Sequence, residues 1–287
     1  MKRWLAGAAC SIAWAAAAQS HWYVQLDNDL GFETDRWYSS GLRASSVARH
    51  GDHEREFGVL HEIYTPDIKG FRAGSIDRAP TSRLLFVAAR HRRSDAAWDT
   101  LELDAGVRGP SAGGRELTRL IHRVVHARDI DWSRQDNDRL DVQLVGSRTQ
   151  KVLDGVNFNY GAVLGNQLAF VHAGAELRIG TRGPNAPSSA VVRFAASPPQ
   201  FGMGLEGCWS AFFAASGRGI LRNEMLERGY AIGEPPLRRR GVARGSAGFS
   251  WAWPGGSVTF AVVHESKEFA QQSRGHTFGS FVGYVDF

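Results

Sequence analysis

Four side chains of the sequence could together hydrolyse an ester. Asn28 and Asp29 supply a carboxamide and a carboxylate, and Ser39 supplies a hydroxyl group shortly after them. An imidazole follows at His122, just beyond the Gly109-Pro110-Ser111-Ala112 segment. A carboxylate with neutral oxygen donors can bind a hard cation, and a histidine can activate a water molecule. These are the parts needed for metal-assisted ester hydrolysis, so the set favours an enzyme.

Water is the nucleophile that this set supports most simply, with His122 as its general base. A cation held by Asp29 and Asn28 would stabilise the negative charge that develops on the carbonyl oxygen. Ser39 as a covalent nucleophile stays open as an alternative, although nothing in the sequence places a base beside it.

The first residues predict an export signal. Lys2 and Arg3 precede an apolar centre, and the small residues at 15–18 suit cleavage by a signal peptidase. We therefore predict a signal peptide over 1–18 and a mature chain over 19–287. Cys208 is the one cysteine left after cleavage, which excludes an internal disulfide and a cysteine metal cluster.

Alternating side chains predict strands along the mature chain. Leu101 and Leu103 alternate with Glu102 and Asp104, which is the period-two pattern of a strand with one polar face. The predicted strands are 21–29, 40–49, 56–64, 83–92, 97–107, 139–149, 157–166, 170–179, 203–215, 239–252, 257–268 and 277–287. Their lengths suit tilted membrane strands, and no apolar run after the signal is long enough for a membrane helix.

Composition and the C-terminus favour a membrane barrel over a secreted sandwich. The chain holds 33 Gly, 9 Trp and 16 Phe with a mean hydropathy below zero, as expected when only alternate residues face lipid. Its last strand ends on Phe287, and outer-membrane barrels commonly end on an aromatic residue. We predict an all-β fold, a transmembrane antiparallel β-barrel of about twelve strands in one domain.

One segment has helical instead of strand periodicity. From 114 to 126, apolar residues recur at helical spacing, and the other face is basic. The apolar residues are Leu117, Leu120, Ile121, Val124 and Val125, and the others are Arg115, Arg119, His122 and His126. We predict a short amphipathic loop helix that packs its apolar stripe on the barrel and presents His122 from a fixed position.

Several motifs resemble those of the outer-membrane lipid A 3'-O-deacylases. Asn28-Asp29 with Tyr38-Ser39-Ser40-Gly41 resembles the first motif of that family, and Ile63-Tyr64-Thr65-Pro66 resembles a later one. The family pattern continues through Asp77-Arg78, through 109–114 with His122, and through Trp132 and Gln135. The resemblance is dense from 28 to 135 and thin afterwards.

The resemblance implies a twelve-stranded barrel in the cell outer membrane, with its site between the barrel wall and a loop helix. The family hydrolyses the 3' acyl ester of lipid A, the membrane anchor of lipopolysaccharide, and requires calcium. By this resemblance, Asn28 and Asp29 correspond to the family's functional Asn-Asp pair and would bind its metal. Ser39 corresponds to the family's small hydroxyl residue, and His122 corresponds to its catalytic histidine.

The basic residues that would bind the substrate are Lys69, Arg72 and Arg78. Lys69 and Arg72 compete for one family position, because the spacing there differs. The net charge of +5 is too diffuse to predict nucleic-acid binding, and the predicted export argues against it. We expect the protein to act on the membrane lipid as a monomer.

One departure from the family bears on activity. The family carries a carboxylate after its histidine where this chain has Arg128, and Asp129 follows as a possible substitute. If Asp129 cannot replace that carboxylate, the chain would be a non-catalytic barrel, either a narrow pore or an inactivated relative. A less favoured alternative is a barrel phospholipase or esterase in which Ser39 is the nucleophile.

Overall fold

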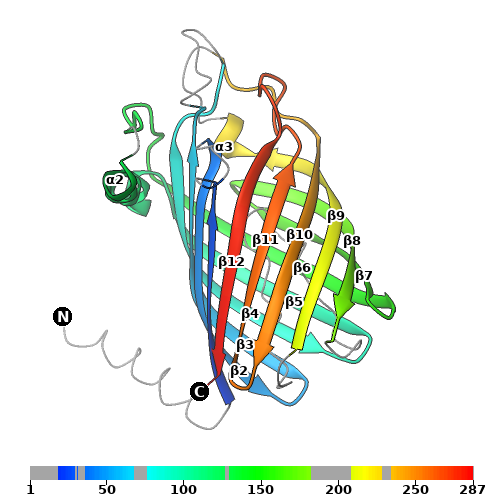
Figure 1. The fold of residues 1–287 in the computed structure, drawn as a ribbon. Helices are drawn as coiled ribbons and strands as arrows, with labels where there is room; N and C mark the ends of the chain where they lie inside the picture. Colours follow the sequence, from blue (N-terminus) through cyan, green and yellow to red (C-terminus); the bar gives the residue numbers. More distant parts are fainter. Residues whose placement is uncertain are drawn as a thin grey trace, which may run out of the picture.

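The protein is a closed antiparallel β-barrel (Figure 1). The computed structural model describes residues 19–29, 31, 36–67, 76–126, 129–181, 208–227 and 234–286, so the predicted signal peptide lies outside the described residues. Each strand pairs with the next along the chain, and the last pairs with the first. Within the described ranges, no helix is long and apolar enough to cross a membrane.

Every predicted strand has a counterpart among the twelve strands of the barrel. They are β1 (Gln19–Asn28), β2 (Trp37–His50), β3 (His53–Thr65), β4 (Thr81–Arg93), β5 (Ala97–Arg108), β6 (Arg139–Leu153), β7 (Val156–Gly165), β8 (Leu168–Gly180), β9 (Cys208–Asn223), β10 (Gly241–Trp253), β11 (Gly256–Glu265) and β12 (His276–Asp286). The predicted loop helix is α2 (Gly114–Val125), which follows the short turn η3 (Pro110–Ala112). A further short helix, α3 (Glu224–Glu227), was not predicted.

The prediction for β9 was wrong at its end. The predicted strand stops at 215, just before Ser216, Gly217 and Gly219, which are residue types that commonly mark turns. Instead the strand runs to Asn223, and Gly217 pairs with Ala173 of β8 and with Ala243 of β10. A strand with neighbours on both sides stays extended despite glycine.

The alternation seen in the sequence separates a lipid-facing wall from a polar lumen. On β5, Leu101 and Leu103 are 58% and 50% exposed on the outer surface. Glu102 and Asp104 point inward and are fully buried. Apolar side chains on the outside contact acyl chains, so the barrel places its charges inside.

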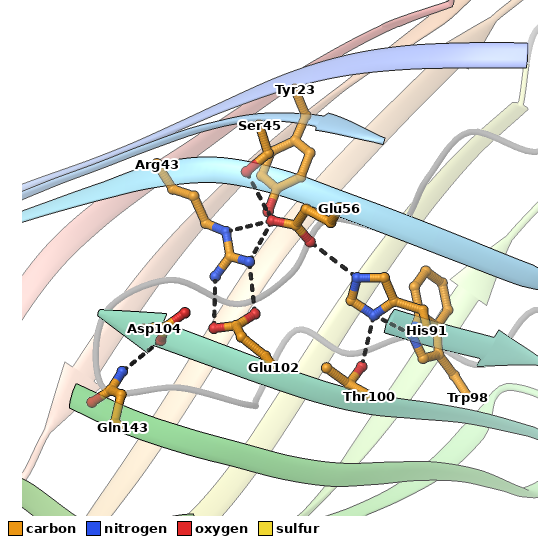
Figure 2. A network of polar contacts seen from close by, with 10 residues as sticks. All are labelled: Tyr23, Arg43, Ser45, Glu56, His91, Trp98, Thr100, Glu102, Asp104 and Gln143. Atoms are coloured by element: carbon orange, nitrogen blue, oxygen red, sulfur yellow. Dashed lines mark hydrogen bonds and ion pairs between the residues drawn. The ribbon is translucent and has the colours of Figure 1, made fainter. Parts of the chain in front are cut away.

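An ion-pair network fills the lumen near the middle of the barrel (Figure 2). The Arg43 guanidinium lies between the carboxylates of Glu56 and Glu102, with its Nη2 atom 2.8 Å from Glu102 Oε2. Tyr23 donates its hydroxyl hydrogen bond to Glu56 Oε1 at 2.7 Å, and His91 Nε2 lies 3.0 Å from Glu56 Oε2. Each buried charge therefore has an opposite charge or a hydrogen-bond partner.

Further buried ion pairs lie elsewhere in the lumen. Arg83 contacts Glu62 at 3.3 Å and Asp141 at 3.0 Å, and Arg218 contacts Glu265 at 2.7 Å. All five side chains are nearly inaccessible to solvent. The described side chains therefore plug the barrel instead of leaving a wide channel.

Removing Arg43 should destabilise the barrel strongly. Arg43→Ala leaves Glu56 and Glu102 buried without their shared cation, and such a loss typically costs about 3–5 kcal/mol. Arg55→Ala is the matched control, because Arg55 lies on the exposed face beside Glu56. Urea titration of the refolded proteins would measure the free energy of unfolding. Equal stability of the two variants would contradict the structural role of the network.

The long connections gather at the end of the barrel opposite to the start of β1 and the end of β12 (Figure 1). They follow β1, β3, β5, β9 and β11, whereas short turns close most of the other end. The connection at 181–207 is the exception. Outer-membrane barrels place long loops outside the cell and short turns in the periplasm, so α2 and α3 lie at the extracellular end.

Candidate active site

A small cavity between the barrel wall and α2 gathers the predicted catalytic residues. Its lining contains Asn28, Asp29, Ser39, Ser40, Ile63, Thr118, Ile121, His122 and Ile130. The first four come from the start of the chain, and His122 comes from the loop helix. The cavity volume is about 20 Å³, and a volume above roughly 10–15 Å³ holds one water molecule.

The cavity is on the outer wall of the barrel, not in its lumen. Along β1, Tyr23, Gln25 and Asp27 are buried inside, and the residues between them are exposed. Asn28 has the same parity as the exposed Leu26 and is only half-buried. Asn28 therefore points outward, which excludes the interpretation that it merely lines a polar lumen.

A β-bulge places Ser39 at the cavity. Tyr38 pairs with Tyr64 and Ser40 pairs with Ile63, so Ser39 is the extra residue of β2. Bulges redirect side chains and are common beside active sites. The Ser39 hydroxyl lies 2.5 Å from Thr65 Oγ1 on the neighbouring strand.

The backbone immediately before the bulge is strained. Trp37 has a φ of 61°, which is unfavourable for a bulky side chain. Its ring is 2% exposed and packs edge-on against Phe269 and His276, with the Arg36 guanidinium 4.6 Å from the ring centroid. Tight packing on several sides holds this conformation, and strain of this kind concentrates at functional sites.

Hydrogen bonds from the neighbouring loops orient Asp29. The backbone N–H of Arg36 donates to Asp29 Oδ2 at 2.8 Å, and the Arg36 guanidinium pairs with Asp67 at 3.2 Å. The backbone N–H of Asp67 in turn donates to Asp77 Oδ2 at 2.8 Å. Burial raises the pKa of the Asp77 carboxyl, although backbone hydrogen bonds from Asp67 and Arg78 oppose the shift.

The start of α2 is fixed closely against the barrel. The backbone N–H of Gly114 donates to Ser82 Oγ of β4 at 3.2 Å, and a Cβ atom on Gly114 would lie 2.4 Å from Ser82 Cβ. His61 Nε2 of β3 also lies 2.8 Å from the Ala112 carbonyl oxygen. Only glycine allows this close approach, so the helix holds His122 at a fixed distance from the wall.

The prediction of which face of α2 meets the barrel was wrong in part. Thr118 and His122, one turn apart, are buried, whereas Leu120 and Val124 are exposed. Leu117 packs against the cluster formed by Ile63, Ile130 and Trp132. The contact of Gly114 with Ser82 and the packing of Leu117 fix the rotation of the helix, and this rotation turns Thr118 and His122 to the cavity. Apolar side chains can stay exposed on the protein surface at little energetic cost where lipid, and not water, surrounds the barrel.

Two other predicted site residues, Asp129 and Arg78, do not line the cavity. Asp129 is exposed, and Arg78 is fully buried, where it pairs with Glu268 at 3.2 Å and stacks over the Tyr64 ring. Lys69, Arg72 and Arg128 fall outside the described residues. The substrate-binding roles of Lys69, Arg72 and Arg78 and the catalytic role of Asp129 stay predictions.

Sequence reasoning missed several lining residues. Thr118 could have been found, because it precedes His122 by one helical turn and such residues share a face. Ser40 could have been found only by placing the bulge. Ile63, Ile121 and Ile130 carry no chemical signal, and they meet only after the strands pair.

The Gly109–Gly113 segment has the Gly-x-Ser-x-Gly spacing of serine hydrolases, which sequence reasoning overlooked. Ser111 is exposed and donates its hydroxyl hydrogen bond to Asp138 Oδ2 at 2.5 Å. Its backbone N–H donates to the same carboxylate at 2.8 Å. Ser111 does not line the cavity, so it braces the loop and is not a nucleophile elbow.

The oxygen donors at the cavity fit a hard cation. Asp29 offers a carboxylate, and Asn28, Ser39 and Ser40 offer neutral oxygens. Among the described residues, no group of three or more His, Cys, Asp or Glu side chains could hold a metal. A cation here would therefore depend on neutral oxygen ligands and water, which calcium accepts and zinc does not prefer.

Comparison with known proteins agrees with this architecture. The model of the family described as outer membrane protein LpxR matches residues 4–287. LpxR from Salmonella typhimurium has a similar structure, with a TM-score of 0.77, 20% sequence identity, and coverage of 93% of this chain and 100% of that chain. No curated protein sequence matches the chain significantly.

A second barrel is similar at lower level. The translocator domain of the autotransporter NalP from Neisseria meningitidis has a TM-score of 0.52 and 11% identity, with coverage of 99% of this chain and 97% of that chain. This likeness concerns the barrel fold alone. The match over 4–287 decides the family: the chain belongs to the LpxR family of outer membrane proteins, the lipid A 3'-O-deacylase family that its motifs resemble.

Proposed function

We propose that this protein is an outer-membrane lipid A 3'-O-deacylase, in which His122 activates the water that attacks the 3' acyl ester. The position of the cavity on the lipid-facing wall carries this proposal. Leu26 lies on the same face of β1 as Asn28 and is 48% exposed. An ester in the outer leaflet could thus enter the cavity while its acyl chain stays against the apolar wall.

His122 would act as general base and then as general acid. A ring nitrogen would take a proton from the water as its oxygen attacks the ester carbon. The same nitrogen would return the proton to the sugar oxygen as the acyl bond breaks, which yields a fatty acid and a free hydroxyl group. The cavity volume of about 20 Å³ suits a single ordered water molecule beside the ring.

Asp29 and Asn28 are the residues that would hold calcium. When bound, the cation would stabilise the negative charge on the carbonyl oxygen in the transition state. The backbone N–H of Arg36 fixes one carboxylate oxygen of Asp29, so the side chain is oriented before any ligand arrives. Such preorganisation avoids a cost of rearrangement during the reaction.

The filled lumen supports an enzyme over a narrow pore. Arg43, Glu56 and Glu102 are inaccessible to solvent at the middle of the barrel. An open channel would leave such charges hydrated. The cavity with the site residues is also on the outer wall of the barrel, whereas a pore would place its functional residues in the lumen.

Ser39→Ala separates the water mechanism from a serine nucleophile. The Ser39 hydroxyl hydrogen-bonds the neutral Thr65 hydroxyl, and the base that lines the same cavity, His122, acts on water in the proposed mechanism. We therefore expect the rate of ester hydrolysis to fall by only about tenfold, as for loss of a positioning hydrogen bond. Complete loss of turnover in this variant, together with a covalent acyl group on Ser39 of the wild-type protein detected by mass spectrometry, would establish Ser39 as the nucleophile instead.

The substrate class is tested by giving the refolded protein two esters in the same detergent. One is lipid A, and the other is a phosphatidylethanolamine with acyl chains of similar length. We expect fatty acid release from lipid A alone, with loss of the 3' acyl group. Release from the glycerophospholipid at a similar rate would favour the phospholipase alternative.

A further inference from the structure

The loop helix α2 exposes two chemically different flanks. Leu120 and Val124 lie one turn apart and are 56% and 70% exposed. Arg115, Arg119 and Arg123 form a second exposed row, each also one turn from the next. At 100° per residue, the basic row lies about 80° and the apolar row about 160° from the face that holds Thr118 and His122, and the two rows are about 120° apart.

The basic row lacks acidic partners. No acidic side chain among the described residues forms an ion pair with Arg115, Arg119 or Arg123, although the lumen is rich in such pairs. Three guanidinium groups in a row, none in an ion pair within the described part of the chain, offer donors to an anionic ligand outside the protein, and arginine suits the bidentate binding of phosphate.

The helix lies where the lipid-facing wall begins. Gly114 rests on Ser82 at the extracellular end of β4. Leu84 and Phe86 follow on the same outer face, and Phe86 is 68% exposed. A strand rises about 3.3 Å per residue, so these side chains lie within roughly 7–13 Å of Ser82 along the strand.

The direction of α2 suits a helix lying in a membrane surface. Figure 1 looks nearly along the helix, which therefore runs across the barrel axis beside the wall. A helix in this direction can lower one flank toward the acyl chains and raise the other toward the headgroups.

We propose that α2 is an interfacial helix that binds the outer leaflet of the membrane. Leu120 and Val124 enter the acyl layer, and the arginine row binds phosphate groups of the surrounding lipids. The occupant is lipid and not a protein partner. The exposed apolar side chains continue the lipid-facing surface of the barrel, and the neighbouring charged row is basic, with Glu116 as the single acidic residue of the helix.

If the protein has the proposed function, the binding of α2 to lipid also positions the active site relative to the membrane. His122 lies on the barrel side of the same helix, so the depth of α2 sets the depth of the imidazole. Lipid bound along α2 would then hold the site at the level of the ester linkages.

Membrane contact can be measured without any enzymatic activity. Single cysteines would replace Leu120, Val124 or Arg119 in the full-length barrel with Cys208→Ser, and each would carry an environment-sensitive fluorophore. The labelled barrels would be reconstituted into phosphatidylcholine vesicles with or without phosphatidylglycerol. Nitroxide-labelled acyl chains and aqueous iodide would then quench the probes.

We expect nitroxide lipids to quench the probes at 120 and 124, and iodide to quench the matched probe at 119. Quenching of all three by iodide, with none by nitroxide lipids, would overturn the proposal. Shielding that appears only at high protein-to-lipid ratio would also overturn it, because contact between two copies would then cover α2. Inactive protein that gives the expected quenching would leave the interfacial helix standing while the deacylase proposal fails.

The basic row is tested in the same vesicles. Phosphatidylglycerol should lower the fraction of the probe at 124 that acrylamide, a neutral quencher not repelled by the anionic surface, can reach by about fivefold or more, since each arginine near an anionic surface contributes roughly that factor. The combined Arg115→Gln, Arg119→Gln and Arg123→Gln variant should lose this response. The matched control Glu116→Gln should keep it. An equal response in both variants would contradict phosphate binding by the row.

Discussion

Replacing His122 by asparagine is expected to lower the rate of lipid A deacylation by about a thousandfold, within the range typical of a lost general base. Asparagine can still donate and accept hydrogen bonds in the cavity, but it cannot take a proton from water. The substrate KM should change little, because the imidazole acts on the water and not on the acyl chains. Mass spectrometry of lipid A over time measures the rate.

His126→Asn is the matched control for this variant. His126 ends the same helix, is exposed, and has a φ of 55°. Asparagine tolerates this left-handed conformation better than most residues, so the helix should remain intact. A similar loss of activity in both variants would mean that α2 was disturbed, and full activity of His122→Asn would exclude the general-base role.

Asp29→Asn is expected to lower the rate by about a hundredfold, as for loss of a group that stabilises the developing oxyanion. The amide oxygen can still accept the hydrogen bond from the Arg36 N–H, so the loop geometry should survive. What disappears is the negative charge that would hold calcium. The calcium concentration for half-maximal activity should therefore rise, and excess calcium should restore part of the rate.

The control for Asp29→Asn is Asp154→Asn. Asp154 lies in a turn at the opposite end of the barrel, and its side chain is 73% exposed. This variant loses the same charge and should keep both the rate and the calcium response. If Asp29→Asn lowered the rate without changing the calcium response, Asp29 would position the substrate and would not be a metal ligand.

The sequence predicted the strands well because alternation is a local property. Leu101 and Glu102 already show which side of β5 faces lipid. The end of β9 was mispredicted because Gly217 has a local preference for turns, and only its pairing with Ala173 and Ala243 keeps it extended. Pairing between distant strands cannot be read from a local pattern.

The sequence predicted those site residues whose side chains carry reactive or metal-binding groups. Asn28, Asp29, Ser39 and His122 were found from their side chains and motifs, and the structure brings them to one cavity. The face of α2 was harder, because an apolar stripe usually marks the buried side. That rule assumes water outside, whereas here a helix beside a membrane can leave Leu120 exposed and bury His122.

The most direct test is mass spectrometry of lipid A after incubation with the refolded protein in detergent. Parallel reactions would contain calcium or a chelator, and His122→Asn would replace the wild type in a third. We expect loss of the 3' acyl group only with wild-type protein and calcium. Unchanged lipid A in the reaction with calcium and verified folded protein would contradict the deacylase function, and deacylation that persists with His122→Asn would contradict the mechanism.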